Sequence, residues 1–333
     1  MTAASPVRIA AALVGTARQG PVRLSVVVPC FNEDAVIAAT HARLAASLGT
    51  IANAKAEIIY VDDGSRDRTL DLLRTIAAAD PTVRVIALSR NFGHQKALTA
   101  GLEHAAGHAV VLIDADLQDP PEVIAEFVAR WRAGVDVAYG VRRRRSGESG
   151  FKLLTAHAYY RLMGRVSDAE IPFDAGDFRL IDRAVLNALR AMPERDRFMR
   201  GMIAWIGFRQ EPVHYDRAPR AAGETKYPFR RMVRFALDGM FSFSATPLRI
   251  ATYFGFVASA MAVVGVVYAF GIRLLTDRVV PGWATLLIAV LFLGGVQLVS
   301  LGIIGEYIAR IYGEVKERPL YLVRERIGFG LDP

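Results

Sequence analysis

The chain has 333 residues, a hydrophobic content of 53% and a formal net charge of +8. Its positive mean hydropathy exceeds what a soluble globular protein of this length requires. The single cysteine, Cys30, excludes an internal disulfide, and no Cys/His cluster in the sequence has zinc-site spacing. These features predict a reducing, cytosolic compartment and an apolar segment outside the globular part.

Residues 1–20 carry a short apolar stretch between Arg8 and Arg18, which lacks the sustained apolar core of a signal peptide. We expect a mostly disordered extension here, with a transient helix on a membrane surface as the alternative. Charges are spread through the sequence that follows, so we expect a globular domain over 21–226.

Short β-rich runs alternate with helical stretches through the first part of this domain. We expect strands at 24–28, 58–61, 83–88, 110–113 and 135–139, and helices near 34–48, 69–79, 94–106 and 121–133. Such alternation is typical of βαβ units and predicts an α/β domain with a mainly parallel sheet. The ligand site of such a sheet lies at the carboxyl ends of its strands.

Polar motifs follow the first four of these strands. They are Pro29-Cys30-Phe31-Asn32-Glu33, Asp62-Asp63-Gly64-Ser65, Ser89-Arg90-Asn91-Phe92-Gly93 and Asp114-Ala115-Asp116-Leu117-Gln118-Asp119-Pro120-Pro121. Neither a G-x-G-x-x-G nor a G-x-x-x-x-G-K-[ST] motif follows the first strand, which disfavours a dinucleotide or P-loop site. Asp114 and Asp116 instead offer hard oxygen ligands for a Mg²⁺ or Mn²⁺ that keeps waters and bridges a diphosphate.

Basic residues crowd before the apolar part of the chain. They lie at 142–145 and at Arg217, Arg220, Lys226, Arg230, Arg231 and Arg234. A positive charge of this size indicates an anionic partner, either nucleic acid or phospholipid headgroups. The position next to an apolar segment favours lipid phosphate, with each cation contributing ~1 kcal/mol near an anionic surface. We therefore expect a membrane and no nucleic acid.

Two uncharged runs, 250–272 and 283–305, fill the segment 249–306. As helices they each span about 34 Å, enough to cross a hydrocarbon core of ~30 Å. The short connector holds Pro281 and Gly282, which predicts a transmembrane hairpin with both ends on one side. Cations are concentrated in the front domain and in a basic tail at 307–333, so both termini are expected in the cytoplasm.

Between domain and hairpin, apolar residues in 227–248 recur at helical spacing, opposite Arg230, Arg234 and Asp238. This pattern predicts an amphipathic helix that lies in the plane of the lipid headgroups. A helix packed on the globular domain is the alternative.

Together these motifs resemble the family 2 glycosyltransferases of the GT-A fold, a Rossmann-like fold, over about residues 22–245. Within that family the chain is similar to the polyprenyl-phosphate glycosyltransferases, to dolichol-phosphate mannose synthase more distantly and to the bactoprenol glucosyltransferases over about 22–325. Further motifs that carry the resemblance are Gly176-Asp177-Phe178-Arg179-Leu180, Arg197-Phe198-Met199-Arg200-Gly201, Asp238-Gly239, Phe241-Ser242-Phe243-Ser244 and Gly302-Ile303-Ile304-Gly305-Glu306-Tyr307.

The resemblance implies a UDP-sugar donor and a polyprenyl phosphate acceptor. It implies a uridine pocket in which Asp63 accepts a hydrogen bond from the base, with Asp62 as the alternative, and whose other members are Pro29, Phe31 and Glu33. The residues implied around the diphosphate are Asp116 as principal metal ligand, Asp114 on ribose or metal, and Gln118 near the sugar phosphate. The look-alikes also assemble as tetramers.

Asp177 matches the carboxylate that the family places beside the reacting centre. An attack opposite the leaving diphosphate predicts inversion at the anomeric carbon. A phosphate acceptor, with a second pKa of about 6, is already largely dianionic at neutral pH and needs no general base. We therefore interpret Asp177 as a group that orients acceptor or metal. Candidate ligands of the acceptor phosphate are Arg200, Arg220 and Lys226, with Arg142 and Arg143 as weaker candidates.

Two other functions share parts of this sequence pattern. A processive polysaccharide synthase usually shows Q-x-x-R-W and more spanning helices, whereas residues 194–198 lack that motif here. A non-catalytic membrane scaffold that binds nucleotide is disfavoured by the intact Asp114, Asp116 and Asp177. The sequence does not discriminate glucose from its epimers or N-acetyl forms, and the resemblance favours UDP-glucose.

Overall fold

The computed structural model describes residues 18, 20–143, 175–217, 246–275 and 282–329. The chain divides into two compact units, the first comprising Met1–Tyr160, Ala169–Tyr227 and Arg318–Pro333, the second Arg161–Asp168 and Pro228–Glu317. The amphipathic helix expected at 227–248 lies outside the described residues except for its last three. Arg220 and Lys226 lie outside them as well.

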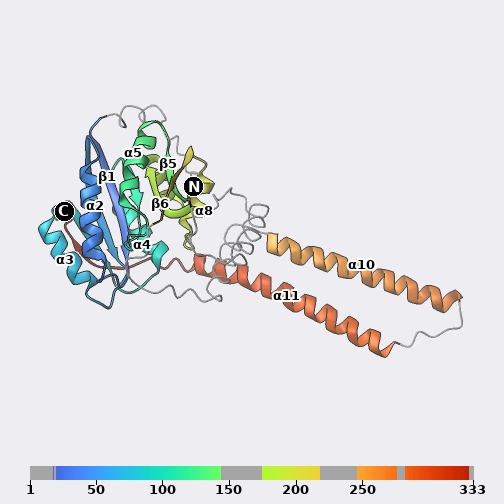
Figure 1. The fold of residues 1–333 in the computed structure, drawn as a ribbon. Coiled ribbons are helices and arrows are strands. Elements are labelled where there is room, and N and C mark those ends of the chain that lie inside the picture. Colours follow the sequence, from blue (N-terminus) through green and yellow to red (C-terminus); the bar gives the residue numbers. More distant parts are fainter. Residues whose placement is uncertain (1–17, 19, 144–174, 218–245, 276–281, 330–333) are drawn as a thin grey trace, which may run out of the picture. The chain divides into compact units, whose positions relative to one another are not determined.

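An eight-stranded sheet forms the centre of the first unit, in the order β7-β5-β6-β4-β1-β2-β3-β8 (Figure 1). Its strands are β1 (Val22–Cys30), β2 (Ala54–Asp62), β3 (Val83–Leu88), β4 (Ala109–Leu112), β5 (Val137–Arg142), β6 (Ala175–Asp182), β7 (Gln210–Tyr215) and β8 (Val323–Ile327). Strands β1 to β4 pair in parallel, as does β5 with β7, whereas β6 and β8 run antiparallel to their neighbours. The mainly parallel α/β sheet predicted from the sequence is confirmed.

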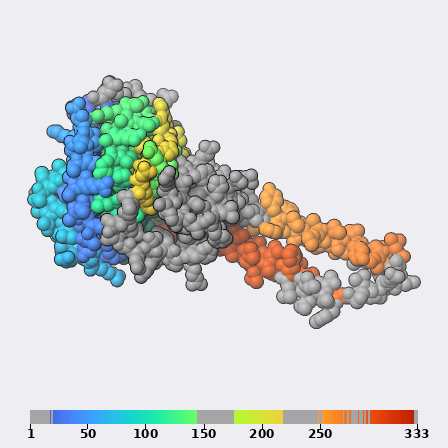
Figure 2. All heavy atoms as spheres, viewed as in Figure 1, coloured from blue at the N-terminus to red at the C-terminus, as the bar shows by residue number. Residues whose placement is uncertain are grey.

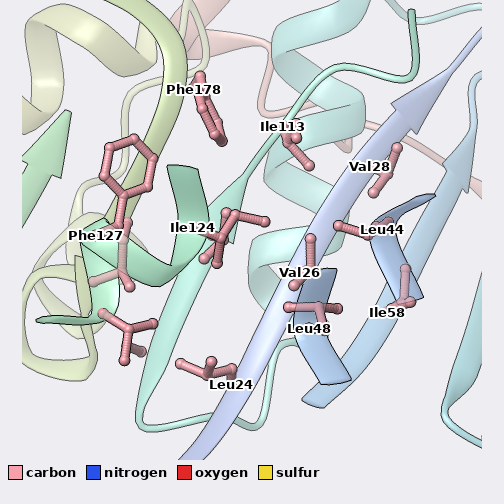
Figure 3. Close-up of a cluster of buried hydrophobic side chains, with 14 of the residues drawn as sticks. Leu24, Val26, Val28, Leu44, Leu48, Ile58, Ile113, Ile124, Phe127 and Phe178 are labelled. Atoms are coloured by element: carbon pink, nitrogen blue, oxygen red, sulfur yellow. The ribbon is translucent and has the colours of Figure 1, made fainter. Parts of the chain in front are cut away.

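Helices cover both faces of this sheet, as expected where parallel strands are linked by crossovers. They are α2 (Ile37–Gly49), α3 (Thr69–Ala79), α4 (His94–His104), α5 (Ile124–Arg132), α7 (Arg183–Ala191) and α8 (Met199–Ile206), with a 3₁₀ turn, η2, at Pro121–Val123. Figure 3 shows Val26 and Val28 of β1 pointing towards Leu44 of α2, and the Phe127 ring near Phe178. These two rings lie 4.7 Å apart between centroids. This core fixes the strand ends that carry the polar motifs.

The segment 307–333, expected as a basic tail, contains both helix and strand. Helix α11 continues to Val315, and residues 323–327 form β8, which pairs with the edge strand β3. Along β8, the partly buried Val323, Glu325 and Ile327 alternate with exposed arginines. This period of two is typical of an edge strand, and charged side chains are common there. The high arginine content masks the alternation in the sequence.

The second unit holds two long helices, α10 (Thr246–Leu275) and α11 (Trp283–Val315), which lie side by side (Figure 1). By length and composition they contain two stretches able to cross a membrane, Ala251–Ile272 and Phe292–Val315. The second stretch begins and ends later in the chain than the expected span 283–305. Figure 2 shows the described atoms of both helices, in orange to red, at the molecular surface. Their large apolar side chains, including Phe256 and Leu298, are exposed.

Candidate active site

The loops that follow β1 and β2 are tied to each other at the carboxyl edge of the sheet. Cys30 and Asp62 are register partners, and the Asn32 amide donates to Ser65 Oγ at 2.9 Å. The Asn32 side-chain oxygen accepts from the Arg66 amide at 2.9 Å, and Asn32 adopts φ +56°, a left-handed conformation that asparagine tolerates. Phe31, a member of the predicted uridine pocket, is 41% exposed.

Asp63 is buried and binds the loop that follows β3. Its Oδ1 accepts from the Phe92 amide at 2.7 Å and its Oδ2 from the Gly93 amide at 2.9 Å. Burial raises the pKa of Asp63, and these two amides act against that rise. Asp62 is also buried and accepts from the Ser65 amide at 3.3 Å. Asp63, predicted to accept from a uridine base, thus also has a structural task that the sequence does not reveal.

The loop after β4 places Asp114 and Asp116 near each other. Asp116 Oδ1 accepts from the Gln118 amide at 3.1 Å, and Leu117 between them has φ +57°. Strained backbone of this kind costs ~1 kcal/mol and often marks functional sites. The pKa of Asp114 is raised to about 6, chiefly by burial, with His94 lowering it and the carboxylates of Asp177, Asp119 and Asp116 raising it. Several carboxyl groups are therefore crowded around Asp114.

This concentration of carboxylates fits a divalent cation. Within the described ranges, no three His, Cys, Asp or Glu side chains are grouped so that they could hold a metal ion by themselves. Asp114 and Asp116 would therefore supply only part of the ligand set, and the rest would come from water and from a bound diphosphate. That is the usual mode for Mg²⁺, which keeps several waters and binds substrate phosphates.

Asp177 lies on β6, with its side chain only 8% exposed, and side chains from α4 and α8 contact it. Arg200 of α8 donates from Nε to Oδ1 at 2.8 Å, and Nη2 lies 3.3 Å from Oδ2. His94 Nε2 lies 3.1 Å from Oδ2, and Gln95 Nε2 lies 3.4 Å from the same oxygen. Burial alone would raise the pKa of Asp177. The Arg200 charge and the hydrogen bonds from His94 and Arg200 outweigh burial and hold the pKa well below its usual range.

His94 links this carboxylate to the predicted metal site. Its Nε2 lies 3.7 Å from Asp114 Oδ1 as well as 3.1 Å from Asp177 Oδ2. Burial lowers the pKa of His94, but the hydrogen bond to Asp177 and the charges of both carboxylates raise it above its ordinary value. Gln95, next in the chain, accepts from the Met199 amide at 2.9 Å and so joins α4 to α8.

Sequence reasoning missed both His94 and Gln95. Gly93, with φ +100°, is the last residue before α4, so these two residues open the helix at the carboxyl edge of the sheet. The sequence feature that could have identified them as site residues is their position directly after the Ser89–Gly93 motif, which follows the end of a strand.

A second basic group surrounds Asp119, which is 2% exposed. Tyr215 donates its hydroxyl to Asp119 Oδ1 at 2.5 Å, and Arg142 Nη2 lies 3.6 Å from the same oxygen. Arg217 Nε lies 3.9 Å from it. Arg142 Nη2 also lies near Gly176, the residue before Asp177. A Cβ added at Gly176 would lie 3.2 Å from this nitrogen. Arg142 thus lies near the backbone next to Asp177.

Two family models match the chain. The model described as "Glycosyl transferase family 2" matches residues 25–190, and "GtrB C-terminal hairpin" matches residues 246–311. A bactoprenol glucosyl transferase of Shigella phage SfII is 40% identical over 309 residues, which cover 91% of this chain and 98% of that protein. The chain belongs to glycosyltransferase family 2.

Other relatives of this glycosyltransferase match over similar lengths. A prophage bactoprenol glucosyl transferase homolog of Escherichia coli K12 is 39% identical, over 91% of this chain and 98% of that protein. An uncharacterized glycosyltransferase of Synechocystis sp. is 48% identical, over 92% of this chain and 96% of that protein. The resemblance indicated by the sequence motifs is confirmed, and the fold is GT-A-like.

Proposed function

We propose that this glycosyltransferase transfers glucose from UDP-glucose to the phosphate of undecaprenyl phosphate, with inversion, at the cytoplasmic face of a membrane. The observation that carries the proposal is the match to bactoprenol glucosyl transferases over nearly the whole chain, both apolar helices included. The buried Asp177, with cations from two helices around it, supports a site where a phosphate reacts.

The donor would bind along the carboxyl ends of β1, β2 and β4. The exposed Phe31 ring offers a stacking surface for uracil, and Asp62 and Asp63, at the end of the neighbouring strand β2, are buried acceptors. Pro29, Glu33 and Gln118 remain proposed donor contacts. A divalent cation, Mg²⁺ or Mn²⁺, at Asp116 and Asp114 would act as a Lewis acid on the departing diphosphate.

The acceptor phosphate would be held by arginines around Asp177. Arg200 of α8 contacts Asp177 directly and Arg142 of β5 lies near the neighbouring Gly176, and guanidinium groups suit bidentate contacts with phosphate. Arg200 also neutralises Asp177, so an incoming phosphate dianion meets less repulsion than an unpaired carboxylate would exert. Arg220 and Lys226 stay proposed ligands of the same phosphate. The acceptor is already ionised, so Asp177 orients it and does not deprotonate it.

The decisive experiment uses the full chain in lipid nanodiscs with undecaprenyl phosphate and radiolabelled UDP-glucose, UDP-galactose or UDP-N-acetylglucosamine. We expect one glucose per lipid, a β-linked product from the α-linked donor, and loss of transfer with a chelator or in Asp116→Ala. A sugar polymer would identify a processive synthase. Nucleotide binding without transfer to any acceptor would identify a scaffold.

We further propose that α10 and α11 cross the membrane and leave both termini in the cytoplasm. Cys30 is buried, so introduced cysteines can be labelled selectively. In intact cells, a membrane-impermeant maleimide should label Thr276→Cys in the connector and spare Arg324→Cys, which is exposed on β8. The reverse labelling would overturn this topology.

A homo-tetramer also remains a proposal for this chain. Mass photometry of the protein in nanodiscs measures it directly, and a mass of one copy would contradict it.

A further inference from the structure

The segment that follows α11 is built onto the sheet of the first unit. Strand β8 pairs with β3 so that Leu88 lies opposite Val323. Arg74 of α3 donates from Nη2 to Glu325 Oε2 at 2.6 Å and from Nε to Oε1 at 3.3 Å. Residues 318–327 are therefore an ordered part of the GT-A-like unit, although two long apolar helices separate them from it in the sequence.

Two consecutive residues of this segment contact both ends of one active-site element. The Leu322 carbonyl accepts from the Ser89 amide at 2.9 Å, at the start of the loop that leads into α4. The Tyr321 hydroxyl donates to the carboxylate of Glu103, one residue before the end of α4. The element formed by loop 89–93 and helix α4 is thus held at its first residue, Ser89, and near its last, at Glu103.

A third contact reaches the loop that precedes α8. The Arg195 guanidinium donates to the backbone carbonyl of Arg318. Helix α8 begins at Met199, whose amide is bound by Gln95 of α4, and it carries Arg200. The segment 318–322 therefore touches the flanks of both helices that supply the contacts of Asp177.

These contacts matter because the hydrogen bonds to Asp177 require the donors on α4 and α8 to be placed accurately. His94, Gln95 and Arg200 all approach this carboxylate within hydrogen-bond range, from 2.8 to 3.4 Å. Hydrogen bonds weaken steeply beyond this range, and a misplacement of about 1 Å in an active site can cost ~100-fold in rate.

We propose that residues 318–322 are a positioning segment for the active site, in which Tyr321 sets the place of α4, and with it of His94 and Gln95, through Glu103. The proposal rests on the function proposed above for the Asp177 site. Tyr321 is a positioning residue and touches no substrate.

The test compares Tyr321→Phe, Glu103→Leu and the double variant in the full chain in nanodiscs. Because Tyr321 acts through Glu103, each single variant should lower kcat about fivefold, the equivalent of one hydrogen bond of ~1 kcal/mol, and the double variant should fall no further. Arg324→Gln is the matched control, since it removes an exposed charge from β8 and should keep the wild-type kcat.

Melting temperatures separate positioning from simple stabilisation. All rates are measured well below the melting temperature of every variant, and a fall in melting temperature with unchanged kcat and KM would overturn the proposal. The affinity for UDP with Mn²⁺ supplies a readout that needs no acceptor, because loop 89–93 also binds Asp63. A wild type that transfers no sugar would contradict the proposed function alone. Unchanged UDP affinity in Tyr321→Phe would then overturn the positioning role.

Discussion

Asp177 and Arg200 are joined by two hydrogen bonds, of 2.8 Å from Nε to Oδ1 and 3.3 Å from Nη2 to Oδ2. This fork-to-fork geometry is the strongest that an arginine and a carboxylate form. The ion pair holds Arg200, a proposed phosphate ligand, in a fixed position relative to Asp177, and it keeps Asp177 ionised. An ionised, hydrogen-bonded carboxylate is suited to orienting an acceptor and poorly suited to removing a proton.

Asp177→Asn should therefore lower kcat by about 100-fold, and by the same factor from about pH 6 to about pH 9. The reason is that the pKa of Asp177 is held well below its usual range, so the group stays charged throughout this window. The measurement is kcat against pH for both proteins with saturating substrates. A loss that follows a single deprotonation would instead identify a general base.

Arg200→Gln should move the acid limb of the pH–rate profile to higher pH than in the wild type. Burial is the largest influence on the pKa of Asp177 and raises it, and without the Arg200 charge that influence is less opposed. Asp177 then becomes protonated, and its charge is lost, at a higher pH as the solution is acidified. Arg43→Gln, which removes an exposed ion pair with Glu122, is the control and should leave the profile unchanged.

Cation binding should depend on the nucleotide. Because the described residues supply no complete metal site, Mn²⁺ alone should bind weakly, and saturating UDP should tighten it at least about tenfold. Calorimetry in buffers of different ionisation enthalpy should detect proton release near pH 6, where Asp114 is partly protonated, and almost none near pH 8. Asp116→Ala should abolish the tightening of Mn²⁺ binding by UDP, and Glu126→Gln, the control, should not. Tight nucleotide-free binding would contradict the proposed ligand set.

Gly64→Ala should weaken UDP binding and destabilise the protein by about 2 kcal/mol or more. Gly64 has φ +69°, and an added Cβ would lie 2.4 Å from the Arg90 carbonyl carbon. The substitution would push the loop 89–93 away from Asp63. Gly49→Ala is the matched control, because a Cβ there meets no atom within 4 Å. Denaturant melts and UDP titrations check both variants, and equal behaviour would refute the close packing.

Arg18→Ala should destabilise the first unit by about 3 kcal/mol, because it leaves two carboxylates without their cation. Arg18 Nη2 lies 2.6 Å from Asp136 Oδ1 and 3.0 Å from Asp182 Oδ2, and its side chain is 6% exposed. Arg23→Ala, at an exposed position, should change stability little. Urea denaturation measures the difference. The sequence-based expectation is a disordered extension at 1–20. A loss of stability in Arg18→Ala would show that this extension is attached to the first unit through Arg18.

The strands β1 to β5, the parallel pairing of β1 to β4 and the polar motifs at their ends follow from the amino-acid sequence alone. Local patterns carry this information, because buried parallel strands are continuous apolar runs and their carboxyl ends meet at one edge of the sheet. Asp114 and Asp116 therefore stand out from their motif without knowledge of the packing, whereas Asp177 is indicated only by the resemblance to the family. Their roles in binding and catalysis remain predictions.

The groups that surround these carboxylates are set by the packing of the folded chain. His94 meets Asp177 across 83 positions of sequence, and Arg74 meets Glu325 across 251. Strand β8 resembles a basic tail in the sequence because its arginines mask a short alternation of partly buried and exposed residues. This alternation identifies a strand only once β8 is seen to pair with β3. Contacts between residues so far apart leave no period or spacing in the sequence, since they are created by the packing of complete elements.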